Sequence, residues 1–512
     1  MFVGAALLLA AAAHGLGGPA RSRGRQAPHQ KPRSAMRMPD LVEDLMATDW
    51  DDANKTDWRR VGSDRRKAHA RRLYGNKRFD MELVFLGTAS CTPSITRGVS
   101  CTALRYDGAT WLFDAGEGTQ IQVQRCSNVH PGSVSKIFVT HTHGDHSFGL
   151  PGLLCLIGSN RDKGSEPIDI YGPDGLRLLI RSMLRLTFSR VAAPYRVHEL
   201  KDVPVQTARG LAPPRDSLAR HERELRAASL GRADAAFGEV DGGRDIQPDA
   251  DGCWTLFETS RQGERHGDVG VRAAPMAHTV PCVGYVVREH DRPGRLDIGL
   301  VEPVVQRNAA ALKLIGVKQP KRVFRILKDL APGQSMTFPD GTVVSAEDCL
   351  APPRDGRVVA ICGDTADASA MLPLLGERGA DVVVHEATNT YIPKYDPQTT
   401  AAAVRQTTAS HGHSTPEMAA AFAIKAGARR LVLTHFSARY KGDSNPMSMD
   451  TMLHIEDQAR NVLRPGHAVA EDPDDPVVAA WDFLTIPVPP RGVSVFDAEL
   501  GADFEPLEDD RP

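Results

Sequence analysis

The clearest chemical group in the sequence is the run HTHGDH at residues 141–146. It places three imidazoles and one carboxylate within six residues, directly after the apolar stretch KIFVT. Imidazole nitrogen and carboxylate oxygen are ligands that zinc and similar divalent ions accept. A solvated polar loop would be a simpler explanation, but this density of ligands at the end of a buried strand favours a metal site.

Three further residues have the context of metal ligands, and they are needed because so short a loop cannot fill two coordination shells. His278 follows VGVRAAPMA, Asp364 ends VVAICGD and His435 follows RRLVLT. Each stands where a strand runs out, which is the usual position of site residues in layered α/β folds. Taken singly, each could equally be a surface or capping residue. Together with HTHGDH, they favour one joint site.

The elements that must position these residues alternate between short β-rich runs and helical patterns. MELVFLG, KIFVT, VVAICGD, DVVVHEA and RRLVLTHF are typical of strands, whereas SFGLPGLLCLIGSN and TPEMAAAFAIKAG are typical of helices. This alternation predicts an α/β domain. Hydrophobic residues make up 41% of the 512 residues, which is enough for a sizeable core and excludes wholesale disorder.

Several segments, in this order, resemble the metallo-β-lactamase superfamily and, within it, the short form of tRNase Z (ribonuclease Z). They are LGTASCTPSITRGVSC, FDAGEGTQIQ with Asp114 behind the metal loop, PMAHTVPCVGYVV, ICGDT, HEAT at 385–388, HGHST at 411–415 and LTHFSARY. The match covers roughly 80–465 and is interrupted at 208–252. The resemblance implies an αββα sandwich with the metals at one edge of the two sheets and a protruding tRNA-binding arm.

The resemblance also implies two Zn²⁺ per subunit, although other divalent ions could serve. It assigns His141, His143 and His278 to one ion, Asp145, His146 and His435 to the other, and Asp364 as the bridge between them. Asp145 would also orient the nucleophile. His413 is the best general acid, and Glu386 the best partner to hold its tautomer. Since Ser414-Thr415-Pro416 is typical of a helix start, His413 could instead be a neighbour of an N-cap, and both roles can hold together.

The function implied is a zinc-dependent endoribonuclease that removes the 3′ trailer from precursor tRNA. Metal-activated water would attack the phosphodiester and leave a 3′-hydroxyl on the tRNA. One alternative is another superfamily phosphodiesterase or hydrolase that acts on a small molecule, against which HGHST and HEAT argue. A second alternative is a catalytically dead RNA-binding relative, against which the complete set of ligands argues.

An RNA partner must be bound by a local patch, because 62 Lys and Arg against 64 Asp and Glu give a net charge of −2. The expected tRNA-binding arm is 288–350, and its basic residues are Lys313, Lys318, Lys321, Arg322, Arg325 and Lys328. A solvated amphipathic helix is the alternative. Where the family commonly has a Gly-Pro-rich turn, this chain has VKQPKR at 317–322, so the arm is expected to differ in geometry.

The position of HTHGDH leaves no room for the degenerate first half of the long form. The short form is expected to be a homodimer in which the arm of one subunit serves the other. Outside a catalytic domain at 80–470 with a surface insertion at 208–252, we expect a targeting leader at 1–39, a charged linker at 40–79 and a peripheral, acidic, Pro-rich tail at 471–512.

The N-terminal leader and the cysteines indicate in which cellular compartment the protein works. FVGAALLLAAAA at residues 2–13 precedes a segment rich in Arg and Lys, with no acidic residue before Asp40, which fits a secretory signal, a transit peptide or a disordered tail. The eight cysteines form no CxxC pair and are typical of buried free thiols. Together these features favour an organelle, a plastid or mitochondrion, over secretion, with the cytoplasm or nucleus as the alternative. The sequence has no internal run of ~18 apolar residues, so we expect no membrane-spanning segment in the mature form.

Overall fold

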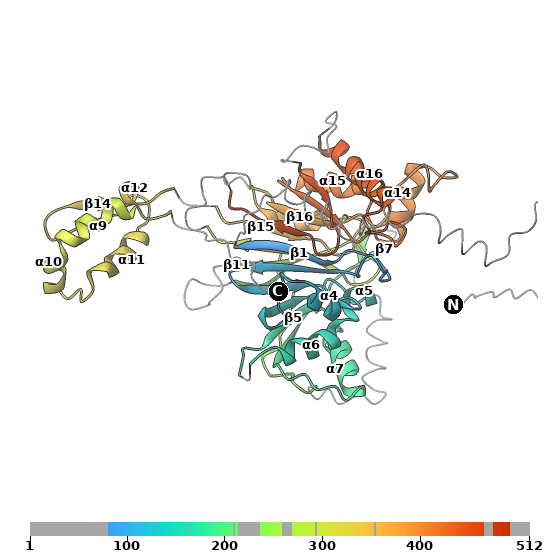
Figure 1. Ribbon diagram of the computed structural model, residues 1–512, viewed down its shortest axis with the longest axis horizontal. Helices are drawn as coiled ribbons and strands as arrows, with labels where there is room; N and C mark the ends of the chain where they lie inside the picture. Colours follow the sequence, from blue (N-terminus) through green and yellow to red (C-terminus); the bar gives the residue numbers. More distant parts are fainter. Residues whose placement is uncertain are drawn as a thin grey trace, which may run out of the picture. The chain divides into compact units, whose positions relative to one another are not determined.

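Two β-sheets lie face to face in the computed structural model, with helices on their outer sides (Figure 1). The structure describes residues 80–162, 164–207, 210–212, 236–258, 269–291, 294–352, 355–464 and 475–491. The leader and the linker that the sequence predicts lie outside the described residues.

The first sheet has eight strands in the order β19-β1-β2-β3-β4-β5-β6-β9. They are β1 (Met81–Gly87), β2 (Cys101–Tyr106), β3 (Ala109–Phe113), β4 (Val134–Phe138), β5 (Ile168–Pro173), β6 (Tyr195–Leu200), β9 (Asp245–Ile246) and β19 (Thr485–Pro487). β1, β2 and β3 pair antiparallel, and β3 to β6 pair parallel. The hairpin between β2 and β3 turns at Asp107 and Gly108, both at positive φ, as an Asp-Gly turn requires.

The second sheet has seven strands in the order β10-β11-β12-β15-β16-β17-β18. They are β10 (Trp254–Glu258), β11 (Val269–Pro275), β12 (Val283–Glu289), β15 (Val358–Ile361), β16 (Val382–Glu386), β17 (Leu431–Thr434) and β18 (Val477–Ala479). β10 to β15 pair antiparallel, and β15 to β18 pair parallel.

The core between the sheets is rich in aromatic rings. Phe138 of β4 stacks on Tyr171 of β5 and lies 5.3 Å, between ring centroids, from Tyr285 of β12 in the opposite sheet. The outer faces are covered by amphipathic helices; α7, for example, buries Leu176, Ile180 and Leu184, which share one face. The αββα sandwich that the resemblance implies is therefore confirmed. The covering elements are α4 (Thr119–Arg125), α6 (Leu150–Ser159) and α7 (Leu176–Leu186) on the first sheet, and η3 (Ser369–Met371), α13 (Leu372–Leu375), α15 (Pro416–Lys425) and α16 (Pro446–Leu463) on the second. The short helix η1 (Pro131–Ser133) directly precedes β4.

The carboxyl ends of the parallel strands meet at one edge of the sandwich. β4 in the first sheet and β15, β16 and β17 in the second all end there, because parallel strands run in the same direction. The two sheets are joined at this edge by hydrogen bonds. The Val283 N–H donates to Thr140 O at 2.9 Å, and the Tyr285 hydroxyl donates to Val139 O at 2.6 Å. The loops that leave these strand ends are thus held close together.

A separate arm leaves the second sheet between β12 and β15 and lies apart from the two sheets (Figure 1, yellow). It has its own apolar core, which includes Val301, Leu312, Val323 and Leu327. At its base the two chain segments pair, and the Ala351 N–H donates to Arg295 O at 2.9 Å. Its elements are α9 (Ile298–Arg307), α10 (Ala309–Leu314), η2 (Pro320–Arg322), α11 (Val323–Lys328), β13 (Ser335–Thr337), β14 (Val343–Ser345) and α12 (Ala346–Cys349).

The prediction that the tail at 471–512 is peripheral is wrong for the part that the structure describes. Residues 475–491 supply β18 to the second sheet and β19 to the first. Between these strands, the Asp482 carboxylate accepts hydrogen bonds from the Gly98 N–H at 2.6 Å and from Gln122 Nε2 at 2.7 Å. The catalytic domain therefore extends past residue 470, because two short apolar runs pair within an acidic, Pro-rich composition.

The expected insertion at 208–252 contains short strands, which its composition did not indicate. β7 (Val205–Thr207) pairs with β8 (Gly210–Ala212), and β9 joins the edge of the first sheet beside β6. The short helix expected at LARHERELRAA lies outside the described residues.

A buried carboxyl group lies between α16 and β18. Glu456 is 6% exposed and accepts a hydrogen bond from the Ala479 N–H at 2.7 Å. Its burial raises the pKa of this carboxyl to about 7. The eight cysteines are free thiols, and all but Cys91 and Cys155 are buried. No helix in the described part of the chain has the length and apolar character that crossing a bilayer would need.

Candidate metal centre

Histidine and carboxylate side chains converge at the edge where the parallel strands end. The HTHGDH run lies on the loop after β4 and on the short helix α5 (Gly144–Ser147). His278 follows β11, Asp364 follows β15, Glu386 is the last residue of β16, and His435 follows β17. His413 lies between α14 (Ala401–Ser410) and α15. Elements far apart in the sequence therefore bring the expected site residues together.

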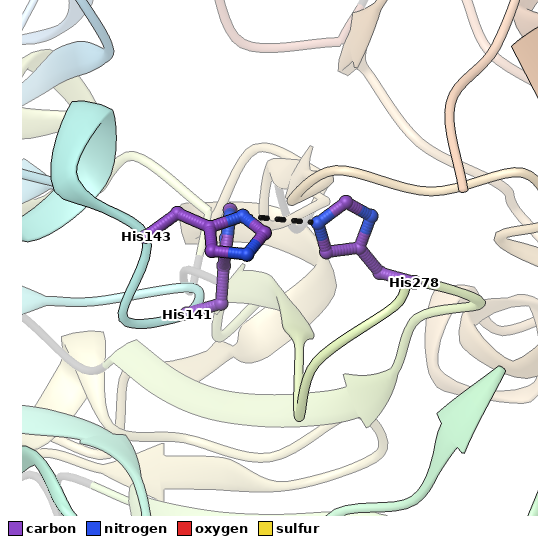
Figure 2. A group of neighbouring side chains, drawn as sticks. All are labelled: His141, His143 and His278. Atoms are coloured by element: carbon purple, nitrogen blue, oxygen red, sulfur yellow. Dashed lines mark hydrogen bonds between the residues drawn. The ribbon is translucent and has the colours of Figure 1, made fainter. Parts of the chain in front are cut away.

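The first group of ligand atoms comes from His141, His143 and His278. Figure 2 shows the three rings pointing toward one another. His143 Nδ1 lies 3.1 Å from His141 Nε2 and 3.3 Å from His278 Nε2. The three nitrogens could hold one metal ion.

The second group comes from Asp145, His146 and His435. His435 Nε2 lies 3.1 Å from His146 Nε2 and 3.4 Å from Asp145 Oδ2. These three atoms could also hold one ion. The Cys91 N–H donates to Asp145 Oδ2 at 2.5 Å, so the loop after β1 fixes this carboxylate from outside.

Asp364 lies between the two groups, with one oxygen toward each. Its Oδ2 is 3.7 Å from His141 Nε2, while its Oδ1 is 3.4 Å from His146 Nε2 and 3.3 Å from His435 Nε2. A carboxylate in this position can bridge two cations.

The outer nitrogens of the histidines test whether this set fits a metal, because a ligand imidazole must present a lone pair inward. His146 Nδ1 lies 2.7 Å from Asp114 Oδ2, and His278 Nδ1 lies 2.9 Å from Gly412 O. Both partners are acceptors, so each Nδ1 carries a proton and each Nε2, which faces the cluster, is the nitrogen that can offer a lone pair to a metal ion. Outer hydrogen bonds of this kind are typical of zinc-binding histidines. The residues therefore fit zinc.

The electrostatics of the cluster differ between its histidines. Burial lowers the pKa of His141 and of His278, which favours the neutral form that a ligand needs. Burial alone would also lower the pKa of His146, but the carboxylates of Asp364 and Asp114 raise it well above its usual range. Without a cation, the His146 ring therefore also carries a proton on Nε2, and a bound metal ion must displace it.

Gly412 is required by the close approach of its loop to His278. Its φ is +79°, and a Cβ at this position would lie 2.7 Å from His278 Nδ1. Any larger residue would push the imidazole away from the hydrogen bond that orients it.

His413 and Glu386 form a hydrogen-bonded pair beside the cluster. His413 Nδ1 lies 3.1 Å from Glu386 Oε1, and the Thr365 N–H donates to the same oxygen at 2.6 Å. Burial alone would lower the pKa of His413, but the Glu386 carboxylate raises it to about 9. The His413 side chain is 20% exposed, so its protonated ring borders the solvent-facing side of the cluster.

Thr388 connects this pair to the second ligand group. Its hydroxyl donates to Glu386 Oε2, which is closer and more strongly negative than the alternative acceptor, His435 O at 3.0 Å. A hydroxyl has one proton, so the oxygen accepts from His435 Nδ1 at 2.8 Å. His435 is thereby held with Nε2 toward the cluster, and one carboxylate orients both His413 and His435.

A comparison with known proteins decides the family. The model of the metallo-beta-lactamase superfamily matches residues 95–211. The human protein "Zinc phosphodiesterase ELAC protein 1" is 36% identical over 423 residues, covering 80% of this chain and 99% of that relative. Ribonuclease BN of Cronobacter sakazakii is 35% identical over 367 residues, covering 71% of this chain and 91% of that relative.

The chain belongs to the tRNase Z family of the metallo-beta-lactamase superfamily. As a member of this family, it is a metal-dependent nuclease. Among solved structures, the crystal structure of human tRNase Z, short form, is 28% identical and covers 80% of this chain and 100% of that one, with a TM-score of 0.47.

The structure brings together the seven expected ligands and the pair formed by His413 and Glu386 of this tRNase Z. It does not bring the six expected RNA-binding residues to the cluster; all of them are exposed on the arm, around α10, η2 and α11. In place of the Gly-Pro-rich turn, residues 320–322 form η2. The sequence did not predict the roles of Thr388, Gly412 and the Cys91 backbone in the site. For Thr388 a signal existed, since it is the last residue of HEAT.

Proposed function

We propose that this tRNase Z is a zinc-dependent endoribonuclease that removes the 3′ trailer from precursor tRNA and leaves a 3′-hydroxyl on the tRNA. The observation that carries the proposal is the Glu386 carboxylate 3.1 Å from His413 Nδ1, beside a cluster of zinc-type ligands. Such a pair provides a proton for the oxygen that leaves when an RNA backbone is cut. The printed name of the human relative of known structure, tRNase Z, supports tRNA as the substrate.

We propose two zinc ions per subunit, one at each ligand group, with Asp364 between them. When bound, such ions lower the pKa of a water molecule and balance negative charge on the phosphate. The origin of the ligands supports this assignment, because each group combines residues that follow a strand of the first sheet with one that follows a strand of the second.

The chain's own residues then divide the work of the reaction. Asp145 orients the attacking water; its pKa, which burial alone would raise, is lowered by the hydrogen bond with His435 and by His146, so it acts as an acceptor held in place. On the opposite side of the phosphate, His413 donates its Nε2 proton to the leaving 3′-oxygen. Glu386 keeps the proton on Nδ1 and thereby sets the ring's orientation.

We propose that the exposed arm residues Lys313, Lys318, Lys321, Arg322, Arg325 and Lys328 bind the RNA backbone. All six are exposed, and the ion pair that one of them forms within the described part of the chain is long, with Lys321 Nζ 3.9 Å from Glu302 Oε1. A net charge of −2 makes such a local patch necessary. We further propose a homodimer in which the arm of one subunit serves the site of its partner. Its stoichiometry is checked by light scattering.

The deciding experiment is incubation of the purified protein with a precursor tRNA, with and without a chelator. We expect cleavage directly 3′ of the discriminator base, a 3′-hydroxyl on the upstream product, loss of activity with chelator and recovery with added zinc. Lack of cleavage in the presence of zinc, together with hydrolysis of bis(p-nitrophenyl) phosphate, would favour the alternative of a small-molecule phosphodiesterase.

We also propose import into a plastid or mitochondrion, on the basis of the apolar and basic leader sequence. A fluorescent fusion of residues 1–80 tests this directly. Cytoplasmic or nuclear fluorescence would contradict it.

A further inference from the structure

One large aromatic side chain at the metal centre remains exposed. Phe148, which directly follows α5, is 57% exposed, whereas Phe113 and Phe138, which lie between the sheets, are buried. The HTHGDH loop thus carries, besides its ligands, an apolar ring that faces solvent.

The ring of Phe148 lies against the loop that supplies two of the proposed ligands. A Cβ at Gly144 would lie only 2.4 Å from Phe148 Cε2 and 2.8 Å from Cζ, so the ring packs on the backbone of Gly144. Gly144 stands between His143 and Asp145, which are the less buried members of the loop's ligands. The phenyl ring therefore forms part of the rim of the metal centre.

The backbone that carries this ring is held on both sides. The Phe148 N–H donates to Gly144 O at 3.0 Å, and the Gly149 N–H donates to Ala115 O at 2.9 Å. A Cβ at Gly149 would lie 2.0 Å from Gly116 O, so this segment packs directly on its neighbour. The side chain is consequently presented from a fixed backbone, which lowers the entropy lost when a flat ligand stacks on it.

The position of His413 determines which part of an RNA this ring faces. The ring centroid of His413 lies 5.2 Å from that of His278, which in turn lies 5.2 Å from that of His143, next to Gly144. His413 thus contacts the ligand cluster at His278 and at His435, whose ring centroid is 5.6 Å away, whereas Phe148 contacts it at Gly144, between His143 and Asp145. The leaving 3′-oxygen belongs to the nucleotide upstream of the cut, so that nucleotide lies on the His413 side.

We propose that Phe148 stacks on the base of the first trailer nucleotide, immediately 3′ of the cut. This inference rests on the proposed function. Stacking needs only the flat face that every base presents, so it suits a trailer whose sequence varies among substrates. Phe148 then acts as a substrate-positioning contact that holds the downstream nucleotide while the phosphate lies over the cluster.

The test compares wild type, Phe148→Ala and Phe148→Trp on three precursor tRNAs. One carries all its bases, one lacks the base of the first trailer nucleotide, and one lacks the discriminator base. Stacking on an aromatic residue changes affinity by roughly 10-fold or more. We expect KM of Phe148→Ala to rise about 10-fold on the intact precursor and on the one without the discriminator base. On the precursor without the first trailer base, we expect its KM to equal that of wild type. Phe148→Trp keeps an aromatic face and should behave as wild type.

Two controls separate stacking from a role in holding the metal loop. Phe188→Ala removes a phenyl ring that is 90% exposed after α7, an element that supplies no residue to the site, and should leave KM unchanged. Zinc affinity, measured by competition with a chromogenic chelator, should be the same for Phe148→Ala and wild type, because the backbone hydrogen bonds that hold this segment do not involve the phenyl ring.

An equal rise in KM on all three precursors would overturn the proposal, as would a rise that disappears only when the discriminator base is missing. A matching loss of zinc affinity would also overturn it. If wild type cuts none of the precursors, the proposed function itself fails, and that result is distinct from the other three.

Discussion

Replacing Thr388 with valine removes one hydroxyl and keeps nearly the same side-chain shape. In the native protein this hydroxyl donates to Glu386 Oε2 and accepts from His435 Nδ1 at 2.8 Å. Both partners are 2% exposed, so water cannot replace the lost hydrogen bonds. The variant leaves a buried carboxylate oxygen and a buried imidazole N–H without their partner.

The size of the effect follows from these two losses. Each buried polar group left unpaired costs about 1–3 kcal/mol. Removing the outer partner of a metal-binding histidine lowers metal affinity by about 10–100-fold. We therefore expect Thr388→Val to bind zinc about 10–100-fold more weakly, with a fall in turnover as well, because Glu386 also orients His413.

Zinc affinity is measured by competition with a chromogenic chelator at fixed pH, and turnover is measured on precursor tRNA. Thr388→Ser keeps the hydroxyl and should stay close to wild type in both assays. Zinc affinity and turnover of Thr388→Val within twofold of wild type would refute the reasoning. A defect in Thr388→Ser as large as that of Thr388→Val would show that the methyl group, and not the hydroxyl, is what matters.

Three other variants test separate parts of the structure. His413→Ala should lower single-turnover cleavage by about 10²–10⁴-fold with zinc content unchanged, and loss of zinc would contradict its role as an acid. Gly412→Ala, whose Cβ would lie 2.7 Å from His278 Nδ1, should weaken zinc binding in the chelator assay. Gly316→Ala is its matched control, since it has a similar positive φ and open space around it. Burial raises the pKa of Glu456 from 4.5 to about 7. The contribution of this carboxyl group to the free energy of unfolding is therefore fully present below pH 4.5 and falls by up to about 3 kcal/mol as the pH rises through 7. Thermal melts of wild type and Glu456→Gln should therefore differ with pH, and parallel curves would show that Glu456 does not titrate in this range.

The sequence was sufficient to predict the strand ends at which the ligands lie. His278, Asp364 and His435 each follow an apolar run, and strands that run in parallel place such positions at one edge. The pairing of His413 with Glu386 was predicted from the resemblance, and the structure puts the two side chains in contact.

The long-range contacts that residues within these motifs make could not be read from local patterns. Thr388 reaches His435 across 47 positions, and Gly412 meets His278 across 134. Nothing in the composition of residues 475–491 separates two edge strands from an acidic tail, because a three-residue strand is too short to show alternation. The partner strand supplies the information that such a short segment lacks.

The late strands β18 and β19 also determine when the enzyme can form during synthesis. β19 pairs with β1, the first strand of the domain, and β18 pairs with β17, whose end carries His435. The first and last strands of the sandwich are thus separated by about 400 residues of chain, which take tens of seconds to translate. Neither sheet has its full edge until residues 477–487 are available. A nascent chain therefore holds a complete HTHGDH loop long before it holds a closed catalytic domain. The nuclease site, whose last ligand His435 follows β17 and thus lies next to β18, is therefore completed only late in synthesis.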